Sequence, residues 1–249
     1  MNWAAKRQAI AIAILVGIVL LLVAIGAFFF LYTPASCIDK KQNQDETGID
    51  CGGSCTTLCV SEALPARIRF VRVLTPVEGR SDIVAYIDNP NENAEARDVH
   101  LTIELYSAAQ VRLGSTEVAL DLPALSSVPL FMPSIGDGTA AKAFMSFVGA
   151  GPVWTKTTQK AVLPVVKDTA LQNTNTPRIT ASLVNPVAKP LRDITIVATV
   201  FDESNNAIAA TQTFVTELPS QGTVPIVFTW NAPFPATPVR YDVVPVPSL

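Results

Sequence analysis

Histidine is nearly missing from this sequence of 249 residues, and cysteine is confined to one short stretch of it. The single histidine, His100, alternates with Val99 and Leu101 in a strand-like run, which puts it on the exposed side of that strand. Without a second imidazole no histidine pair can hold a metal, and a Ser-His-Asp or Cys-His mechanism has no evident second member. These shortages predict that the protein is not an enzyme.

An excess of charge of either sign is also lacking. The chain has 18 basic and 21 acidic side chains, so there is no positive surplus to hold a polyanion. No glycine-rich phosphate loop follows a strand and opens a helix. The sequence predicts no nucleic-acid partner, and no cofactor apart from the calcium ion considered below.

Charge is absent altogether between Gln8 and Tyr32, where the side chains are almost all apolar. A helix of this length spans the roughly 30 Å hydrocarbon layer with room for tilt. A secretory signal peptide is one alternative, but its apolar region usually has only about 7–15 residues. A lipidated Cys37 is another, although Pro34 stands where that motif has an aliphatic residue. We expect an uncleaved transmembrane helix over residues 8–32, in contact with the lipid bilayer.

The compartment follows mainly from the cysteines. All four of them, Cys37, Cys51, Cys55 and Cys59, lie close behind the apolar run, and grouped thiols of this kind persist as disulfides in an oxidising compartment. Basic residues flank the apolar run on both sides, so the positive-inside rule gives only weak support for a cytoplasmic N-terminus. We expect residues 1–7 to be a cytoplasmic stub at the cell membrane, and the chain beyond the helix to be extracytoplasmic.

Residues 33–64 form a polar, acidic segment with too few apolar side chains for a core. Cross-links must therefore hold any fixed shape that it has, and the sequence does not choose among the three pairings of four cysteines. Zinc is the metal alternative, but the Cys-x-x-Cys pairs of tetrahedral thiolate sites are missing. We predict a disulfide-bonded acidic spacer.

Hard oxygen donors in the spacer suggest a calcium site. The candidate ligands are Asp39, Asn43, Asp45 and Asp50, and nearby glycines permit sharp turns. Lys41 counts against this hypothesis, because it occupies the third position of an EF-hand loop aligned from Asp39. The alternative is a solvated linker whose charges keep it soluble.

The spacer resembles a recurrent motif of bacterial surface proteins, roughly C-x-D-G-x-x-N-x-x-E-x-x-x-D-C-G-G-x-C. The resemblance implies a disulfide-bonded, cation-binding spacer, although Lys40 stands where the motif often has glycine. The matching positions are Cys37, Asp39, Asn43, Glu46, Asp50, Cys51, Gly52, Gly53 and Cys55.

The remainder of the chain contains an internal repeat. Four landmarks in the same order indicate duplication of a unit of about 90 residues, the size of one small β-sandwich. The matched segments are Ala85–Pro90 with Ala181–Pro186, Asp98–Tyr106 with Asp193–Phe201, Leu122–Pro123 with Leu218–Pro219, and Val128–Leu130 with Val224–Ile226.

Within each unit apolar and polar residues alternate as in half-buried strands. The whole chain has 19 prolines, most of them in these two units, where they help to supply the turns between strands. The sequence predicts an all-β fold behind the N-terminal helix, with two tandem immunoglobulin-like β-sandwiches over residues 65–150 and 161–249. Residues 151–160 join them as an exposed linker. In this linker Trp154 either fixes the two units against each other or stays partly exposed.

The succession of Asn-Pro, an alternating strand that ends in an aromatic residue, a polar hairpin and Leu-Pro resembles the FxLYD-type immunoglobulin-like domain. The resemblance covers Arg67–Val148 and Ala161–Val246, and the first copy has Ser107 where the second has Asp202 after the aromatic residue. It implies seven-stranded sandwiches of an extracellular protein.

Two apolar residues, Val197 and Phe201, fall on the face of their strand opposite to Ile194 and Ile196. This second face is either covered by another sheet or the neighbouring domain, or it is a surface for a partner.

These observations predict a non-catalytic, single-pass membrane protein that displays two sandwiches for binding, adhesion or a structural role, with a protein partner of unknown identity. The alternative is an accessory subunit of an envelope assembly or secretion complex, whose helix packs on partner helices. Gly17 and Gly26 offer no small-xxx-small face for such packing.

Overall fold

The computed structural model describes residues 3–31, 36–135, 138–158 and 161–247. The chain divides into two compact units, Met1–Cys59 and Val60–Leu249. Several boundaries predicted above lie outside the described residues, namely those at Met1, Tyr32, Thr33, Lys160 and Leu249.

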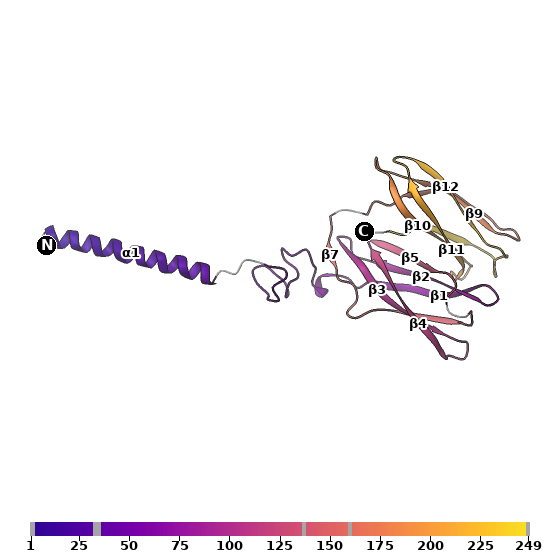
Figure 1. Ribbon diagram of the computed structural model, residues 1–249, viewed down its shortest axis with the longest axis horizontal. Coiled ribbons are helices and arrows are strands. Elements are labelled where there is room, and N and C mark those ends of the chain that lie inside the picture. The colour runs from indigo at the N-terminus through magenta and orange to yellow at the C-terminus, as the bar shows by residue number, and fades with distance from the viewer. Residues whose placement is uncertain (1–2, 32–35, 136–137, 159–160, 248–249) are drawn as a thin grey trace. The chain divides into compact units, whose positions relative to one another are not determined.

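The first unit begins with helix α1, Trp3–Leu31 (Figure 1). Within it, Lys6–Leu31 is long and apolar enough to cross a membrane, and none of this segment is buried in the chain. Its 26 residues extend over about 39 Å, more than the roughly 30 Å of a hydrocarbon layer. The predicted helix is confirmed, and its length and composition fit a membrane anchor as well as a signal sequence.

The second unit is built of antiparallel strands. After the short 3₁₀ turn η1 (Val60–Glu62), the strands are β1 (Arg67–Val77), β2 (Arg80–Asn89), β3 (Ala94–Tyr106), β4 (Arg112–Leu122), β5 (Ser126–Met132), β6 (Lys142–Phe147), β7 (Thr155–Lys156), β8 (Val165–Gln172), β9 (Arg178–Val184), β10 (Leu191–Phe201), β11 (Ala207–Leu218), β12 (Thr223–Thr229) and β13 (Arg240–Pro245).

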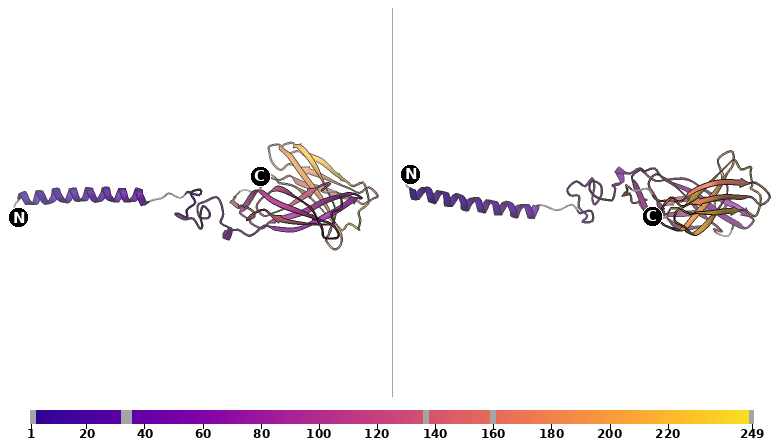
Figure 2. Two further views of the ribbon diagram at one scale, coloured as in Figure 1. Left: turned by 60° about the horizontal axis from the view of Figure 1, so that its bottom comes forward. Right: turned by 90° about the horizontal axis from the view of Figure 1, so that it is seen from above.

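These strands form four sheets. The first sandwich has the sheet β1-β2-β5 against the sheet β4-β3-β6, with β7 paired to β3. The second sandwich has β12-β9-β8 against β11-β10-β13. Figure 2 shows the two groups of strands from two further sides. The predicted all-β fold of sandwiches behind one N-terminal helix is therefore confirmed.

Each sandwich encloses its own core, as the alternation in the sequence predicted. On β3 the apolar residues from Val99 to Leu105 are buried at every second position, and Ile103 packs against Ile83 of the facing sheet. In the second sandwich Ile196 of β10 packs with Phe228 of β12. Burial of such side chains is the main favourable contribution to folding.

The two sandwiches pack against each other through β1-β2-β5 and β11-β10-β13. A third apolar cluster spans this interface, and it includes Phe70, Tyr86, Val197 and Phe201. The rings of Phe70 and Phe201 meet edge to face with centroids 6.1 Å apart. The second face of β10 is therefore covered by the neighbouring sandwich, which was one of the two predicted alternatives.

A buried hydrogen bond crosses the same interface. The Tyr86 hydroxyl donates to Oγ1 of Thr199 at 3.2 Å, and both side chains are almost fully buried. Burial of the phenol raises the pKa of Tyr86 to about 12, since the charged form would lose its hydration. Thr199 is the polar exception on an otherwise apolar stretch of β10, and Tyr86 supplies its partner.

Two asparagines occupy matching places in the two sandwiches. The side-chain amide of Asn89 donates to the carbonyl oxygens of Leu122 and Pro123, and that of Asn185 donates to those of Leu218 and Pro219. Their Oδ1 atoms each accept a backbone N–H two residues further on. The Asn-Pro pairs, which stand at the end of β2 and directly after β9, thus tie a distant loop to the end of each strand.

Trp154 is buried rather than partly exposed. It lines a small cavity together with Val60 and Pro65, which precede β1, and with Phe147 at the end of β6. The described residues around it belong to the first sandwich and to the segments directly before β1 and after β6. The tryptophan thus fixes the linker to the first sandwich.

We predict that removing the Tyr86 hydroxyl weakens the interface. The substitution Tyr86→Phe should lower the free energy of unfolding by about 1–3 kcal/mol, because Thr199 then stays buried without this donor. Urea unfolding at neutral pH measures the difference. Tyr106→Phe is the matched control, since that hydroxyl bonds to the partly exposed Glu104 and should matter little.

The same phenol gives a pH dependence whose sign follows from its pKa. Because the folded-state pKa is raised from about 10 to about 12, the contribution of Tyr86 is present below pH 10 and is lost as the pH rises through 12. Tyr86→Phe should flatten this alkaline loss of stability. A wild-type protein whose loss of stability above pH 10 matches that of the variant would contradict the account.

Candidate functional site

The cysteine segment is the feature that the sequence singled out most strongly. In the structure Cys37 pairs with Cys55 and Cys51 pairs with Cys59, so the two disulfides interleave. No free cysteine is found in the described part of the chain. The predicted disulfides are confirmed, and the zinc alternative has no thiolate left to use.

The backbone between the cysteines is a series of tight turns. Gly53 has φ +52°, and a Cβ atom there would come within 1.9 Å of the Asp45 carbonyl oxygen, so a glycine is required. Lys40 has φ +62°, in the left-handed region that glycine adopts without strain. Lys40 therefore adopts a backbone conformation that glycine would reach at lower cost.

The carboxylates predicted to bind calcium hold these turns by hydrogen bonds. Asp50 accepts the backbone N–H groups of Asp39 and Lys40, each at 2.9 Å. Asp39 accepts the N–H of Lys41 at 2.9 Å and the side-chain amide of Asn43 at 2.8 Å. A carboxylate that accepts backbone N–H groups in this way fixes the turn that carries them.

The remaining carboxylate of the predicted calcium set points elsewhere. Asp45 accepts the Ser54 hydroxyl at 2.9 Å. None of Asp39, Asp45 and Asp50 belongs to a group of three close acidic, histidine or cysteine ligand atoms in the described residues. Of the predicted set, the Asn43 side-chain oxygen is buried without a hydrogen-bond partner. The structure thus brings Asp39, Asn43 and Asp50 into one hydrogen-bonded turn, and the calcium site stays a prediction.

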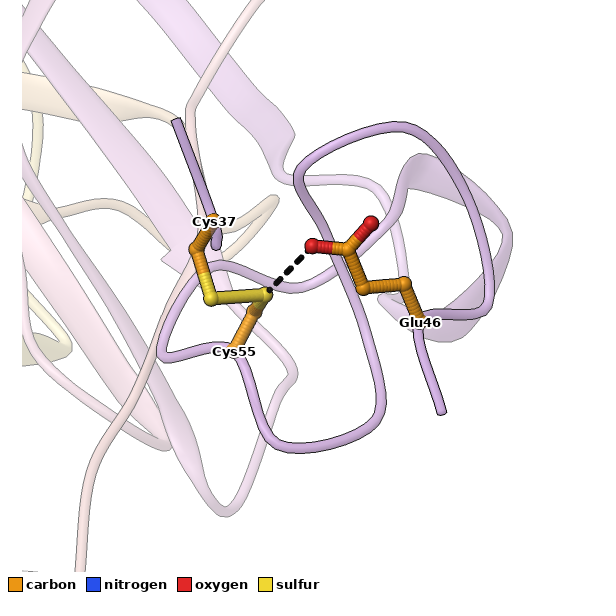
Figure 3. Close-up of side chains that lie close together, drawn as sticks. All are labelled: Cys37, Glu46 and Cys55. Carbon is orange, nitrogen blue, oxygen red and sulfur yellow. Dashed lines mark hydrogen bonds between the residues drawn. A yellow bond between two sulfur atoms is a disulfide. The ribbon is translucent and has the colours of Figure 1, made fainter. Parts of the chain in front are cut away.

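Glu46 is the acidic residue that the structure places at the centre of the module. Its side chain is buried, Oε2 accepts the N–H of Asn43 at 3.1 Å, and Oε1 lies 3.3 Å from Sγ of Cys55 (Figure 3). Cys37, Cys55 and Glu46 are the one group of three ligand atoms within 4.8 Å among the described residues. Because both sulfurs are in a disulfide, they are not thiolate ligands, and the group does not form a metal site in this state.

A carboxylate beside a disulfide also affects how that disulfide breaks. Thiol exchange at the Cys37 sulfur expels the sulfur of Cys55 as a thiolate. A carboxylate next to that sulfur disfavours the negative charge that develops on it. The position of Glu46 therefore disfavours this route of reduction. Sequence reasoning matched Glu46 to the motif, but no pattern indicated its burial.

His100 lies on the exposed face of β3, as its alternation predicted. Its Nδ1 is 2.7 Å from Oε1 of Glu117 on β4, and its Nε2 is 3.3 Å from Oδ2 of Asp98. The hydrogen bond with Glu117, followed by that with Asp98, raises the pKa of His100 above 6.5. An imidazole held between two exposed carboxylates forms a surface ion pair when protonated.

Comparison with known proteins adds little to this geometry. No protein-family model and no curated protein matches the chain. Solved structures that are similar in part include red sea bream transglutaminase, with 14% identity, a TM-score of 0.24, and coverage of 74% of this chain and 29% of that one. A β-glucuronidase of glycoside hydrolase family 2 has 13% identity, a TM-score of 0.23, and coverage of 64% and 21%. The chain spans less than a third of the length of either protein, and TM-scores this low support no inference about the fold or function of this chain.

We predict that Asp50 acts as a structural acceptor for the turn at Asp39 and Lys40. Asp50→Ala should speed the reduction of the Cys37–Cys55 disulfide by dithiothreitol about fivefold, since the turn beside Cys37 loses its acceptor. Asp45→Ala is the control and should have a smaller effect, because Asp45 bonds an exposed hydroxyl. Rates are followed by alkylation and mass spectrometry.

Measuring the reduction rate with and without calcium distinguishes Asp50 as a hydrogen-bond acceptor from Asp50 as a calcium ligand. If Asp50 is only a structural acceptor, the reduction rate of the wild-type protein is the same in calcium and in a chelator. Protection of the wild-type disulfide by calcium, lost in Asp50→Ala, would show instead that the predicted calcium ligands bind the ion.

We also predict that His100 titrates above its ordinary pKa of 6.5, measured by NMR on its ring Cε1 proton. Glu117→Gln should lower the pKa of His100 more than Asp98→Asn, since the hydrogen bond with Glu117 contributes most to the raised pKa. Because the folded-state pKa is raised, the stabilising contribution is present below pH 6.5 and is lost as the pH rises through the folded-state value. A wild-type titration at or below 6.5 would refute this arrangement in solution.

Proposed function

We propose that this chain is a non-catalytic, single-pass membrane protein that displays a rigid pair of β-sandwiches outside the cytoplasm. The observation that carries the proposal is helix α1, whose apolar side chains are exposed all round over Lys6–Leu31. A helix of this kind is stable in lipid, because its backbone groups bond within the helix and its side chains contact acyl chains. In water the same surface would be a strong aggregation hazard.

The spacer supports the proposed orientation. Its two disulfides require an oxidising compartment, and they begin only six residues after the end of α1 at Leu31. In the proposed topology Lys6 and Arg7 stay on the cytoplasmic side, and the spacer and both sandwiches lie outside. The cross-links give a short polar segment a fixed shape without a core.

We further infer that the two sandwiches are tandem copies of one immunoglobulin-like unit of the FxLYD type. The matching hydrogen bonds of Asn89 and Asn185 to a following Leu-Pro pair support the duplication. Binding, adhesion or structural display is the proposed role, because the pair presents two outer sheets on one rigid body. A fold alone does not fix a ligand.

The proposal predicts the chemical state of the protein extracted from membranes. Intact-mass measurement with and without reduction should give a full-length chain in which no thiol is alkylated before reduction. A mass that lacks α1 would identify a cleaved signal sequence, and four alkylated thiols would place the spacer in a reducing compartment. Either result overturns the proposed topology.

A matched pair of variants tests the anchor itself. Leu20→Arg combined with Leu21→Arg places two charges at the centre of α1, at a cost of about 2.5–3.5 kcal/mol each, and should release the protein from carbonate-washed membranes. Leu20→Ile with Leu21→Ile should leave it in the membrane. Gentle detergent extraction then distinguishes the alternative role, since an accessory subunit should co-purify with a stoichiometric partner and a display protein should not.

A further inference from the structure

One end of the first sandwich carries exposed apolar side chains. They come from three parts of the chain, namely Val60 and Leu64 before β1, Leu125 between β4 and β5, and Val153 before β7. Between 58% and 85% of the surface of each of these four residues is exposed. Single exposed apolar residues are normal on a protein surface, whereas a group of them marks an interaction site.

Hydrogen bonds of Asn91 hold two of these residues at the same end. Asn91 lies in the loop between β2 and β3, and its side chain is buried. Its Oδ1 accepts the N–H of Leu64 at 2.7 Å, and its Nδ2 donates to the Leu64 carbonyl oxygen at 2.8 Å. Its main-chain carbonyl oxygen accepts the N–H of Leu125 at 2.7 Å. Asn91 therefore fixes the backbone of both exposed leucines.

The other two residues belong to segments that meet beside Trp154. Val60, Pro152 and Trp154 line one cavity, and Val153 stands between the last two in the sequence. Over residues 60–66 and 147–154 the sequence has one charged side chain, that of Glu62. A surface with so few charges is easily moved out of water, because the main cost of such a transfer is the desolvation of charged groups.

The second sandwich indicates that the fold does not require this apolar end. In the predicted alignment Gln221 is the counterpart of Leu125. Both residues have a left-handed backbone, with φ 49° at Leu125 and φ 52° at Gln221. Both also donate their N–H to the loop that follows the Asn-Pro pair of their own sandwich. A polar side chain suits the same turn, so the conformation of the turn does not explain the exposed leucine.

A short tether joins this end to the proposed membrane anchor. An extended chain between Leu31 and Val60 could reach about 100 Å. The Cys37–Cys55 disulfide, whose Cα atoms are 5.6 Å apart, shortens that path to about 45 Å at most. In the proposed topology the surface of the bilayer is thus always within reach of Val60, and tethering raises its effective concentration so that a weak contact suffices.

We propose that this apolar end of the first sandwich inserts into the surface of the bilayer that holds α1. Leucine and valine side chains gain free energy on transfer to the boundary of the acyl chains. Insertion is shallow, because Glu62 and the exposed Glu92 at the same end stay in contact with water. The inference rests on the proposed single-pass topology and adds a second contact with the membrane. A bilayer is favoured over a second copy of the chain, since the tether supplies it at every concentration of the protein.

Tryptophan fluorescence in vesicles tests the insertion. The full chain is reconstituted in phosphatidylcholine with and without brominated acyl chains, which quench tryptophans in contact with them. Leu125→Trp places a probe at the apolar end, and Gln221→Trp places the same probe in the matching turn of the second sandwich. After subtraction of the wild-type signal, we expect quenching at Leu125→Trp to be about threefold that at Gln221→Trp. Tryptophan itself favours the bilayer surface, and the control carries the same bias.

A second pair of variants tests whether the apolar side chains drive the insertion. Val60→Ser with Leu64→Ser, added to Leu125→Trp, should lower the quenching of the probe about twofold, because less apolar surface enters the bilayer. Val111→Ser with Leu113→Ser is the matched control. These two residues are also exposed, but they lie beside the hairpin at the other end of β3, so quenching should not change.

Four outcomes overturn the inference. These are equal quenching of the two probes, no quenching of either probe in a chain that floats with the vesicles, quenching of Leu125→Trp that the serine substitutions leave unchanged, and self-association of the chain that shields this probe as the ratio of protein to lipid rises. A chain that does not float with the vesicles contradicts the anchor as well. Flotation therefore distinguishes failure of the proposed topology from failure of this inference alone.

Discussion

The burial of β2 and β10 on both of their faces is the constraint on which the second unit depends. An isolated sandwich buries one face of each sheet and leaves the other in water. Here Tyr86 and Phe201 lie on faces that would be outer faces in separate sandwiches, and they meet in a shared apolar cluster. The Tyr86–Thr199 hydrogen bond orients this contact, because Thr199 is fully buried and Tyr86 supplies its side-chain partner across the interface. The stable unit is therefore the pair.

Periodicity in the sequence predicted the inner faces well and the outer faces poorly. Apolar and polar side chains alternate over residues 99–105 because β3 has one buried face, so the sequence pattern alone identified the side that faces the core. On β10 both faces are apolar, and the pattern around Val197 and Phe201 left open whether the second face is covered within the chain or is a surface for a partner. That answer depends on contacts between distant parts of the chain, which no local pattern records. The same holds for the contact of Tyr86 with Phe201, whose strands are far apart in the sequence.

The spacer shows a different limit of prediction from composition. The clustering of cysteines predicted disulfides but not their interleaved pairing, which occurs in a segment of tight turns that includes the left-handed Lys40. Asp39 and Asp50 were chosen as calcium ligands because their oxygens suit that ion. A carboxylate that holds a turn by accepting N–H groups uses the same oxygens, so chemistry alone could not separate the two roles. The burial of Glu46 against a disulfide left no trace in the sequence beyond a motif position.

The contact between the sandwiches joins two different sheets, and this bears on polymerisation. In the predicted alignment β9 corresponds to β2 and β3 corresponds to β10, so each sandwich has a free face that this alignment matches to the face its neighbour uses. Head-to-tail contacts of this kind grow into filaments when the free faces stay adhesive. Here Thr102 stands at the position of Val197, and Ser182 stands at the position of Tyr86. At these two positions the free faces carry polar side chains in place of the apolar and aromatic ones of the shared contact, which disfavours the addition of a third sandwich there, whereas Tyr106 keeps an aromatic ring at the position of Phe201.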